Sequence, residues 1–472
     1  MIPKDFSECV AHFNKLLNVD HNFDIVYRQI KIAGRDAALY FVDGFCKTAE
    51  LRAMIEILME ICDEKLVKNA SNFSQKYITG AQSKVSDNEI EISTAVLSGE
   101  TVLFVEGFSE AILINTRSYP QRNTSEPDKD KVFRGSRDGF VESIILNTAL
   151  VRRRIRDPRL VFEHMQVGSQ SKTDVALCYI KGRADASLLA NIKNKLQKTS
   201  VESLTMNQES IAELLQPKQW RNPLPKFKFT ERPDATAAHV LEGDIAIIVD
   251  NSPAVLIVPI TIFSIMEEAN DFYFPPVIGT YLKLTRALVM ILTIFITPLW
   301  LLVLQNPQIV PEGLSFILTT DDTQVPLVIQ LLILEIAIDG LNLASLNTPN
   351  MLVSSLSILA AIIVGDYAVE SGWFSSQALL YTAFVSLACF AQPGYELGYA
   401  LKFVRMFLLI LTGIFGLVGF IIGCAITAFV VLRTKTLSGK SYLYPLIPFD
   451  WKKFKHHLYR ASLSEKQNNK KY

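Results

Sequence analysis

Five apolar runs in the second half of the sequence are long enough to be membrane helices. They cover residues 283–304, 325–344, 351–369, 375–392 and 404–432. About 20 apolar residues in a helix span the hydrocarbon core of a bilayer. Residues 287–432 contain only two Lys or Arg side chains and eight acidic ones, which is atypical of a soluble core. The pattern therefore predicts an all-α polytopic membrane domain over residues 276–434.

The second run, 325–344, carries polar side chains where a membrane helix is expected. Glu335 and Asp339 lie one helical turn apart, and Asn342 shares their face. Ionisable groups inside membrane segments usually face protein or water because lipid solvates them poorly. Two interpretations remain open. The three residues line a pathway whose sign favours cations, or the acids pair with Lys402 and Arg405.

Three further acids lie closer to the predicted loops. Asp366 and Glu370 form another pair spaced by four residues, and Glu396 falls between the fourth and fifth runs. They are candidate polar contacts of the membrane domain. Their place near the ends of the runs favours a structural role at helix ends over a role in a pathway.

Charge is distributed unevenly along the chain. Residues 1–286 hold 35 basic and 37 acidic side chains, whereas residues 433–472 hold ten basic and two acidic ones. The start, MIPKDFSECV, has no apolar signal segment, so we expect the N-terminal region in the cytosol. The positive-inside rule places the basic tail, 435–472, there too. Two cytosolic ends require an even number of crossings, so we predict four spans plus one re-entrant or interfacial segment, for which 325–344 is the candidate.

The last apolar run is rich in glycine. Its glycines are Gly413, Gly416, Gly419 and Gly423, and the last two form a GxxxG pattern. Small residues at this spacing let membrane helices pack closely. Packing within the chain and contact between copies in a homo-oligomer are both compatible with the pattern.

The N-terminal half contains an internal repeat. VLSGETVLFVEGFSEAILI at 96–114 aligns without a gap with VLEGDIAIIVDNSPAVLIV at 240–258. Each segment predicts three short strands, with a first turn at Gly99 or Gly243 and a second turn near residue 107 or 251.

A second pair of similar segments precedes these two. ALYFVDGF at 38–45 and ALCYIKGR at 176–183 are β runs that end in a turn, and helical patterns follow them near 48–64 and 186–198. The N-terminal region is therefore predicted to be α+β. It would consist of two similar α/β subdomains, residues 1–130 and 161–275.

Residues 131–160 between the subdomains predict an arginine-rich helical connector. From Asp138 a helix is expected, and Pro158 ends it. Its apolar face would comprise Phe140, Ile144, Ile145 and Leu150. Its last turns carry Arg152, Arg153, Arg154 and Arg156. These arginines are candidates for contact with a neighbouring subunit or with lipid phosphates, and pairing with acids inside the domain is equally compatible.

Several functional classes lack support in the sequence. There is no P-loop, no GxSxG, no HExxH and no GxGxxG after a strand, so neither an enzyme nor a cofactor or metal site is predicted. The six cysteines are scattered without a CxxC pair and are expected to be free. The N-terminal region is not basic overall, which argues against nucleic-acid binding.

Three motifs resemble a known family. FRGSRDGFVESIILNTALVRRRIRDPRL at 133–160, IVDNSPAVLIVP at 248–259 and PGYELGYALKFVR at 393–405 are similar to the GerA family of spore germination proteins, A-subunit type. The resemblance covers about residues 20–450. Within the family, FVDGF, KTDVALCYIKG and DFYFPPVIGTYLKLTR look most like the stage V sporulation branch. A subunits of nutrient receptors often carry a long low-complexity N-terminal extension, and this sequence has almost none.

The resemblance implies a protein of the spore inner membrane. A-type subunits of the family are thought to form oligomeric ion channels that release monovalent cations during germination. The stage V branch is thought to work with a small membrane-protein partner and to amplify germination. The alternatives are an A subunit that joins B and C subunits in a nutrient germinant receptor, or a non-conducting membrane scaffold that docks a partner channel.

Overall fold

The computed structural model describes residues 2–3, 5–46, 48–61, 69–78, 80–119, 134–216, 222–318, 321, 323–347 and 367–460. The chain divides into two compact units. One contains residues 1–219 and 227–259, and the other contains residues 220–226 and 260–472. The boundary at Pro259 lies upstream of the predicted boundary at residue 275.

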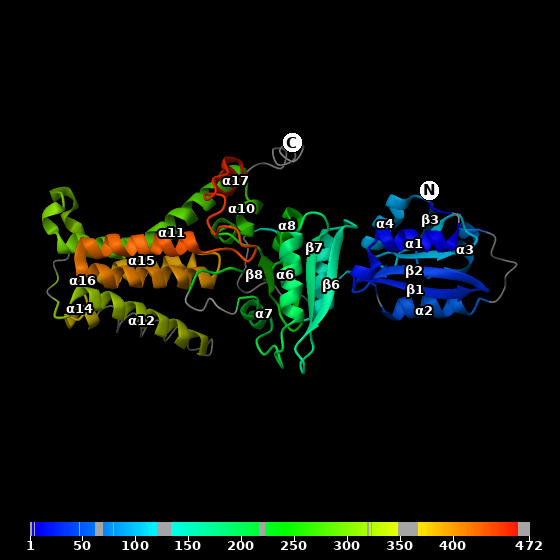
Figure 1. The fold of residues 1–472 in the computed structure, drawn as a ribbon, viewed down its shortest axis with the longest axis horizontal. Helices are drawn as coiled ribbons and strands as arrows, with labels where there is room; N and C mark the ends of the chain where they lie inside the picture. The colour runs from blue at the N-terminus through cyan, green and yellow to red at the C-terminus, as the bar shows by residue number, and fades with distance from the viewer. Residues whose placement is uncertain are drawn as a thin grey trace. The chain divides into compact units, whose positions relative to one another are not determined.

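The first unit contains two five-stranded sheets with the same topology. The first sheet has the order β1-β2-β4-β5-β3 and the second has β6-β7-β9-β10-β8, with all neighbours antiparallel (Figure 1). The strands are β1 (Ile25–Ile32), β2 (Arg35–Val42), β3 (Ser83–Ser86), β4 (Thr101–Val105), β5 (Ala111–Ile114), β6 (Leu160–Val167), β7 (Thr173–Ile180), β8 (Lys228–Thr230), β9 (Ile245–Val249) and β10 (Val255–Val258). The repeat predicted from the sequence is therefore confirmed as two α/β subdomains.

Helices cover the sheets, so that strands such as β4 and β9 are buried along their whole length. In the first subdomain they are α1 (Phe6–Leu16), α2 (Thr48–Met59), α3 (Ala70–Tyr77) and α4 (Glu89–Leu97), with the short 3-10 helix η1 (Val19–His21). In the second they are α5 (Ile144–Arg154), α6 (Ala186–Gln197), α7 (Asn207–Leu215) and α8 (Pro233–Glu242). Residues of α1 and α4 pack on one face of the first sheet, and residues of α2 and α3 pack on the other. The predicted helices near 48–64 and 186–198 are α2 and α6.

The prediction of three strands around Gly99 and Gly243 is wrong in its first element. Residues 96 and 97 end helix α4, and residues 240–242 end helix α8. Gly99 and Gly243 have positive φ, 91° and 109°, and each closes its helix. The amides of Glu100 and Asp244 donate to carbonyls five residues back, at 3.0 and 3.1 Å, as in a Schellman cap. The repeated unit is therefore helix–strand–strand.

The connector helix also begins later than predicted, at Ile144 rather than Asp138. The side chain of Asn147 accepts from the amide of Val141 at 2.8 Å and so holds that residue outside the helix. The amide of Ile144 donates to Oδ1 of Asp250 at 3.0 Å, so the turn after β9 caps α5. Of the predicted apolar face only Ile145 is exposed.

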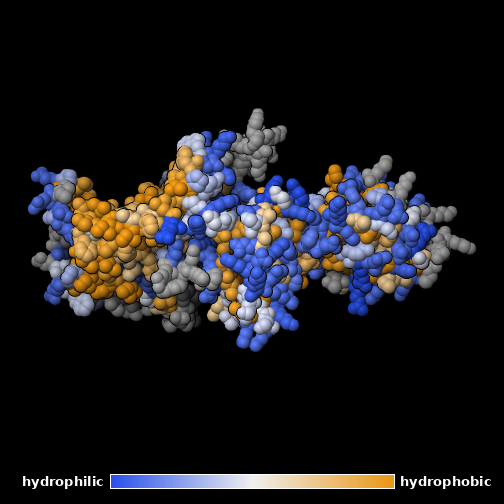
Figure 2. All heavy atoms as spheres, in the orientation of Figure 1, coloured by the Kyte–Doolittle hydropathy of each residue, from blue (hydrophilic) through white to orange (hydrophobic). Residues whose placement is uncertain are grey.

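In the described residues of the second unit, the regular structure is helical apart from an isolated bridge between Lys435 and Ser441. Its helices are α9 (Ile262–Ile265), α10 (Ala269–Tyr273), α11 (Pro276–Gln305), η3 (Pro307–Ile309), η4 (Glu312–Ile317), α12 (Leu327–Asn347), α14 (Ala368–Glu370), α15 (Ser376–Phe390), α16 (Tyr395–Arg433) and α17 (Trp451–Leu458). Helix α11, residues 327–345 of α12, and α16 are long and apolar enough to cross a membrane, and α15 is a shorter apolar helix. Apolar side chains dominate the surface of this helical group (Figure 2). Of the predicted run 351–369, residues 351–366 lie outside the described residues.

Helix α16 reverses direction at Gly416. That residue has φ 59° and ψ −136°, which are not helical, and it divides the 39-residue segment into two helices. A Cβ added at Gly423 would lie 2.7 Å from Cδ2 of Leu408, although 15 residues of continuous helix would separate the two by about 22 Å. The ring of Phe420 also lies 6.3 Å from that of Phe295 in α11. The last apolar run is therefore a pair of antiparallel helices.

This reversal changes the count of apolar segments. Among the described residues, the apolar segments are α11, α12, α15 and the two halves of α16, and the assignment of 325–344 as the segment that does not cross stays a prediction. Helix α12 runs continuously through Gly340. After α16, the backbone oxygen of Tyr442 accepts from the amide of Ile262 at 3.1 Å. The start of α11 and the end of α16 therefore lie at the same end of the helical group.

Candidate functional site

Four charged side chains from α12 and α16 meet among the apolar helices. Nε and Nη2 of Arg405 contact Oε1 of Glu335 at 2.8 and 2.6 Å. Nζ of Lys402 lies 2.6 Å from Oδ2 of Asp339 and 3.3 Å from Oε2 of Glu335. The acids are four residues apart and the bases three apart, so one face of each helix carries a complementary pair. We call these four residues the α12–α16 cluster.

The α12–α16 cluster is buried and tied to two further helices. Arg405 is 0% exposed and Glu335 is 2% exposed. Nη1 of Arg405 donates to the backbone oxygen of Thr293 in α11 at 3.1 Å, and it lies 3.8 Å from Sγ of Cys389 in α15. Nζ of Lys402 donates to the backbone oxygen of Glu335 at 2.9 Å. Two negative and two positive charges therefore balance where four helices converge, an arrangement that tolerates burial of charge.

The predicted pathway residues differ in their surroundings. Glu335 is enclosed and paired with Arg405, the partner proposed in the structural interpretation. The Asp339 side chain is 35% exposed and shares its cation, Lys402, with Glu335. Asn342, the next polar residue on this face, is also partly exposed. Of the three predicted pathway residues, Asp339 and Asn342 are therefore accessible and Glu335 is not.

The other predicted acids lie at helix ends. Glu370 ends the short helix α14, Glu396 lies in the first turn of α16, and both are exposed. Asp366 lies outside the described residues. Neither Glu370 nor Glu396 belongs to the α12–α16 cluster.

Arg152 joins the two subdomains of the first unit. Its guanidinium makes a bidentate contact with Asp24, with Nε at 2.8 Å from Oδ2 and Nη2 at 3.0 Å from Oδ1. Nη1 also donates to the backbone oxygen of Leu160 at 3.2 Å. Both charged residues are at most 1% exposed. The side chain of Arg152 is therefore used within the chain and is not accessible to a lipid phosphate.

The other three arginines of this segment are more accessible. The guanidinium of Arg153 lies 4.6 Å from the ring centroid of Tyr119. Nη2 of Arg154 pairs with Asp138 at 3.0 Å. Arg156 is exposed, and its Nη2 donates to the hydroxyl of Tyr119 at 3.2 Å. Their assignment to a subunit or lipid contact stays a prediction.

The glycines of α16 pack within the chain. A Cβ at Gly413 would lie 2.7 Å from a methyl group of Val328 in α12. A Cβ at Gly419 would collide with the carbonyl oxygen of Leu411, and Gly423 packs on Leu408. The GxxxG pattern therefore allows the second half of α16 to lie against the first.

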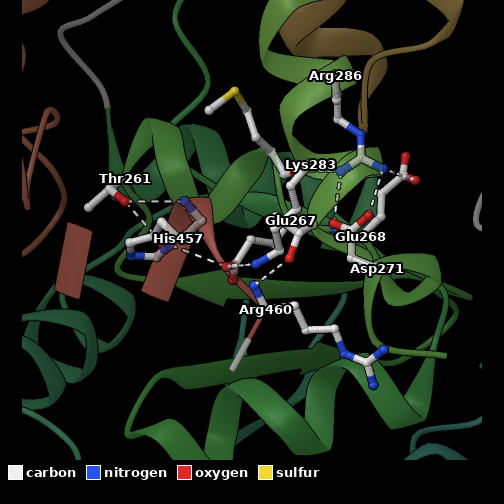
Figure 3. Close-up of polar contacts among 11 residues, drawn as sticks. Thr261, Glu267, Glu268, Asp271, Lys283, Arg286, His457 and Arg460 are labelled. Carbon is white, nitrogen blue, oxygen red and sulfur yellow. Dashed lines mark hydrogen bonds and ion pairs between the residues drawn. The ribbon is translucent and has the colours of Figure 1, made fainter. Parts of the chain in front are cut away.

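A second charged cluster precedes the first apolar helix and was not predicted from the sequence. It comprises Glu267, Glu268 and Asp271 before and within α10, Lys283 and Arg286 of α11, and His457 of α17 (Figure 3). We call these six residues the α10–α11 cluster. Arg286 contacts Asp271 at 2.8 and 3.1 Å and Glu268 at 2.7 Å. The acids fix the entry of the chain into α11.

The C-terminal helix contributes to this cluster through Glu267. Oε1 of Glu267 lies 2.8 Å from Nζ of Lys283 and 3.2 Å from Nδ1 of His457. Burial alone would raise the pKa of the Glu267 carboxyl. The hydrogen bond from His457 and the charges of Lys283 and His457 outweigh this effect and hold the pKa well below its ordinary value. Three acids that precede two basic residues at the start of an apolar helix were the local sequence signal for this cluster. No local pattern indicated that His457 would join it.

A family model and several known proteins match this chain. The model described as Bacillus/Clostridium GerA spore germination protein matches residues 12–472. Stage V sporulation protein AF of Bacillus subtilis is 36% identical over 442 residues, which cover 93% of this chain and 89% of that protein. Spore germination protein KA of Bacillus subtilis is 28% identical over 471 residues, covering 98% of this chain and 85% of that protein.

The chain is also similar to a solved structure. It is the crystal structure of the N-terminal domain of the A subunit of the Bacillus megaterium spore germinant receptor GerK3. The match has 26% sequence identity and a TM-score of 0.42, and it covers 55% of this chain and 96% of that chain.

Proposed function

Because this chain belongs to the GerA family of spore germination proteins, we propose that it is a subunit of an oligomeric ion channel in the spore inner membrane. The channel releases monovalent cations and amplifies the germination response. The N-terminal region and the C-terminal tail face the cytosol, and a small membrane protein is its partner. No enzymatic role is proposed.

The α12–α16 cluster is the observation that supports conduction. Lipid tails do not solvate four charges, so their presence among apolar helices requires protein or water around them. Within the cluster, Glu335 and Arg405 anchor the helices. Asp339 and Asn342 supply the accessible polar face of α12, and a partly exposed carboxylate attracts cations. We therefore assign the pathway to Asp339 and Asn342 and the anchoring role to Glu335.

Potassium flux from liposomes that contain the purified protein tests this assignment. Asp339→Asn removes the accessible charge and preserves its shape, so we expect a several-fold loss of cation selectivity with the protein intact. Glu396→Gln is the matched control, because that acid is exposed outside the cluster and its loss should leave flux unchanged. Unchanged conductance and selectivity in Asp339→Asn would remove this residue from the pathway.

A non-conducting scaffold that docks a partner channel is the second candidate. The exposed Arg156 and the partly exposed Arg153 and Arg154 support it. Charge reversal at these three positions would then abolish co-purification of the partner while Asp339→Asn had no effect. Arg152 is excluded from that test because its substitution would disrupt the first unit.

The two roles known in the family, nutrient-receptor A subunit and stage V protein, can be distinguished by the partner that co-purifies. A nutrient-receptor A subunit would co-purify with B and C subunits from germinating spores, whereas the stage V role predicts co-purification with a small membrane protein. The 36% identity with stage V sporulation protein AF supports the latter.

A further inference from the structure

Beyond α16 the chain turns back onto the segment that precedes α11. We call residues 434–460 the C-terminal return. Nδ2 of Asn222 donates to Oγ1 of Thr434 at 2.9 Å, and the rings of Phe263 and Phe454 meet edge to face with centroids 5.7 Å apart. Near the end of the C-terminal return, His457 contacts Glu267. One side of the C-terminal return is therefore fixed to its own unit.

The C-terminal return also exposes large apolar side chains. Phe449 and Trp451 are each 62% exposed, and their ring centroids are 6.0 Å apart. Leu446 and Ile447 are exposed beside them in the sequence. Trp in particular is enriched at the boundary between lipid and water, where its apolar ring and polar N–H are both satisfied.

Positive charge accompanies this apolar surface. Helix α17, WKKFKHHL, carries Lys452, Lys453 and Lys455, all exposed, and no acid. The nearest acid in the sequence, Asp450, is used as the helix cap and accepts from the amide of Lys453 at 3.2 Å. Within the described part of the chain, neither Lys452 nor Lys455 forms an ion pair. Nζ of Lys453 lies 5.2 Å from the ring centroid of Tyr444. The surface therefore combines aromatic rings with exposed positive charge.

The position of the C-terminal return fits a membrane surface. Residues 406–432 of α16 carry no charge, and Arg433, which ends the helix, is exposed. The C-terminal return starts at the next residue, so it begins at the edge of the apolar segment. Its anchor at residues 260–275 leads directly into α11, whose first turns expose Val277 and Tyr281. The start of α11 and the end of α16 therefore both lie next to the C-terminal return, where these apolar helices would enter the hydrocarbon region of the bilayer.

We propose that Phe449, Trp451 and the three lysines of α17 form a docking surface for anionic phospholipid headgroups. The rings insert at the boundary of the hydrocarbon, and the lysines contact phosphates of the same leaflet. Each lysine near an anionic surface strengthens binding to that surface by roughly fivefold. Two other kinds of surface would indicate other occupants. If α17 carried equal numbers of acids and bases, a protein partner would be favoured. If the surface were apolar throughout, it would insert into lipid without a preference for anionic headgroups.

Quenching of Trp451 fluorescence by bromine-labelled lipids tests the proposal in the full-length protein. The protein is reconstituted in nanodiscs that contain brominated phosphatidylglycerol or brominated phosphatidylcholine at equal fractions. Trp451→Phe removes one of the four tryptophans, so the difference from the wild type isolates its signal. We expect severalfold stronger quenching by phosphatidylglycerol.

Two triple substitutions separate charge from structure. Lys452→Gln, Lys453→Gln and Lys455→Gln together should equalise quenching by the two lipids, whereas the corresponding three Lys→Arg changes should preserve the difference. A Trp451 signal that neither lipid quenches would place the ring against water or protein, including a second copy, and overturn the proposal. Equal quenching by both lipids in the wild type, or an unchanged preference in the Gln variant, would overturn recognition of anionic headgroups.

Discussion

The two charged clusters of the helical unit are built differently. In the α12–α16 cluster, two carboxylates face one lysine and one arginine, and all four lie on apolar helices. In the α10–α11 cluster, three carboxylates face one lysine, one arginine and one histidine. The first has as many acidic as basic side chains and no histidine. The second has one acid more than its lysine and arginine together, and His457 contacts one of these acids, Glu267, at 3.2 Å.

This difference indicates separate roles. The α12–α16 cluster holds α11, α12, α15 and α16 together through the contacts of the buried Arg405. The α10–α11 cluster joins the start of α11 to a helix near the C-terminus through His457 and Glu267, whose side chains are 22% and 16% exposed. The former is expected to be essential for stability and the latter to be adjustable.

The largest effect is expected from Glu335→Gln. The substitution leaves the guanidinium of Arg405 buried without its carboxylate, and breaking a buried pair in this way costs about 3–5 kcal/mol. We expect a large fall in the thermal midpoint of the detergent-solubilised protein, measured by loss of a monodisperse peak after heating. The double change Glu335→Leu with Arg405→Met should recover most of the stability. No recovery would show that the pair does more than neutralise charge.

Asp271→Asn should have a smaller effect, although Asp271 is fully buried. Arg286 would keep its contacts with Glu268 and with the backbone oxygen of Met266, at 2.7 and 2.8 Å. We therefore expect a loss of about 2 kcal/mol, the range for a hydrogen bond to a charged group. The same heating experiment measures it, with Glu312→Gln as an exposed control. A loss as large as that of Glu335→Gln would contradict the distinction between the two clusters.

Parts of this arrangement were visible in the sequence because they depend on local spacing. Glu335 and Asp339, and likewise Lys402 and Arg405, are helical neighbours, so their pairing could be stated as an alternative. The repeat was visible because glycines such as Gly99 and Gly243 recur at turns. The helix before each of them was mistaken for a strand, since a short apolar run has no distinct periodicity.

Other parts depend on tertiary structure alone. His457 contacts an acid 190 residues earlier in the chain, and no local pattern joins the two. Pairing of the four arginines with acids inside the domain was an open alternative, but only the fold identifies Asp24 as the partner of Arg152. Gly416 was one of four glycines in an apolar run, and only its backbone angles mark the reversal.

Gly416→Ala tests the reversal directly. A residue with a Cβ is strained at φ 59° and ψ −136°, so we expect a loss of about 1–2 kcal/mol in stability. Gly340→Ala is the matched control. It lies in α12 with open space around the added Cβ, and Ala there should be neutral or stabilising by up to about 1 kcal/mol. Equal effects of the two substitutions would argue against a strained turn at Gly416.

The smallest effect concerns the attachment of α17. His457→Phe keeps a ring against Phe263, at a centroid distance of 5.8 Å in the wild type, but removes the hydrogen bond to Glu267. We expect a loss of about 1 kcal/mol, seen as severalfold faster hydrogen exchange in residues 451–460 of the intact protein.

The same contact should respond to acid. The pKa of Glu267 is lower in the folded protein than its ordinary value of 4.5, so its carboxylate stabilises the attachment fully above that pH. This stabilisation is lost as the pH falls through the lower, folded value. Exchange in residues 451–460, corrected for its intrinsic pH dependence, should therefore stay slow down to about pH 4.5 and accelerate below it. Glu267→Gln should exchange faster at every pH and lose this transition. If the transition persisted in that variant, another acid of the α10–α11 cluster would control the attachment, and the comparison between the clusters would then rest on Glu268 and Asp271.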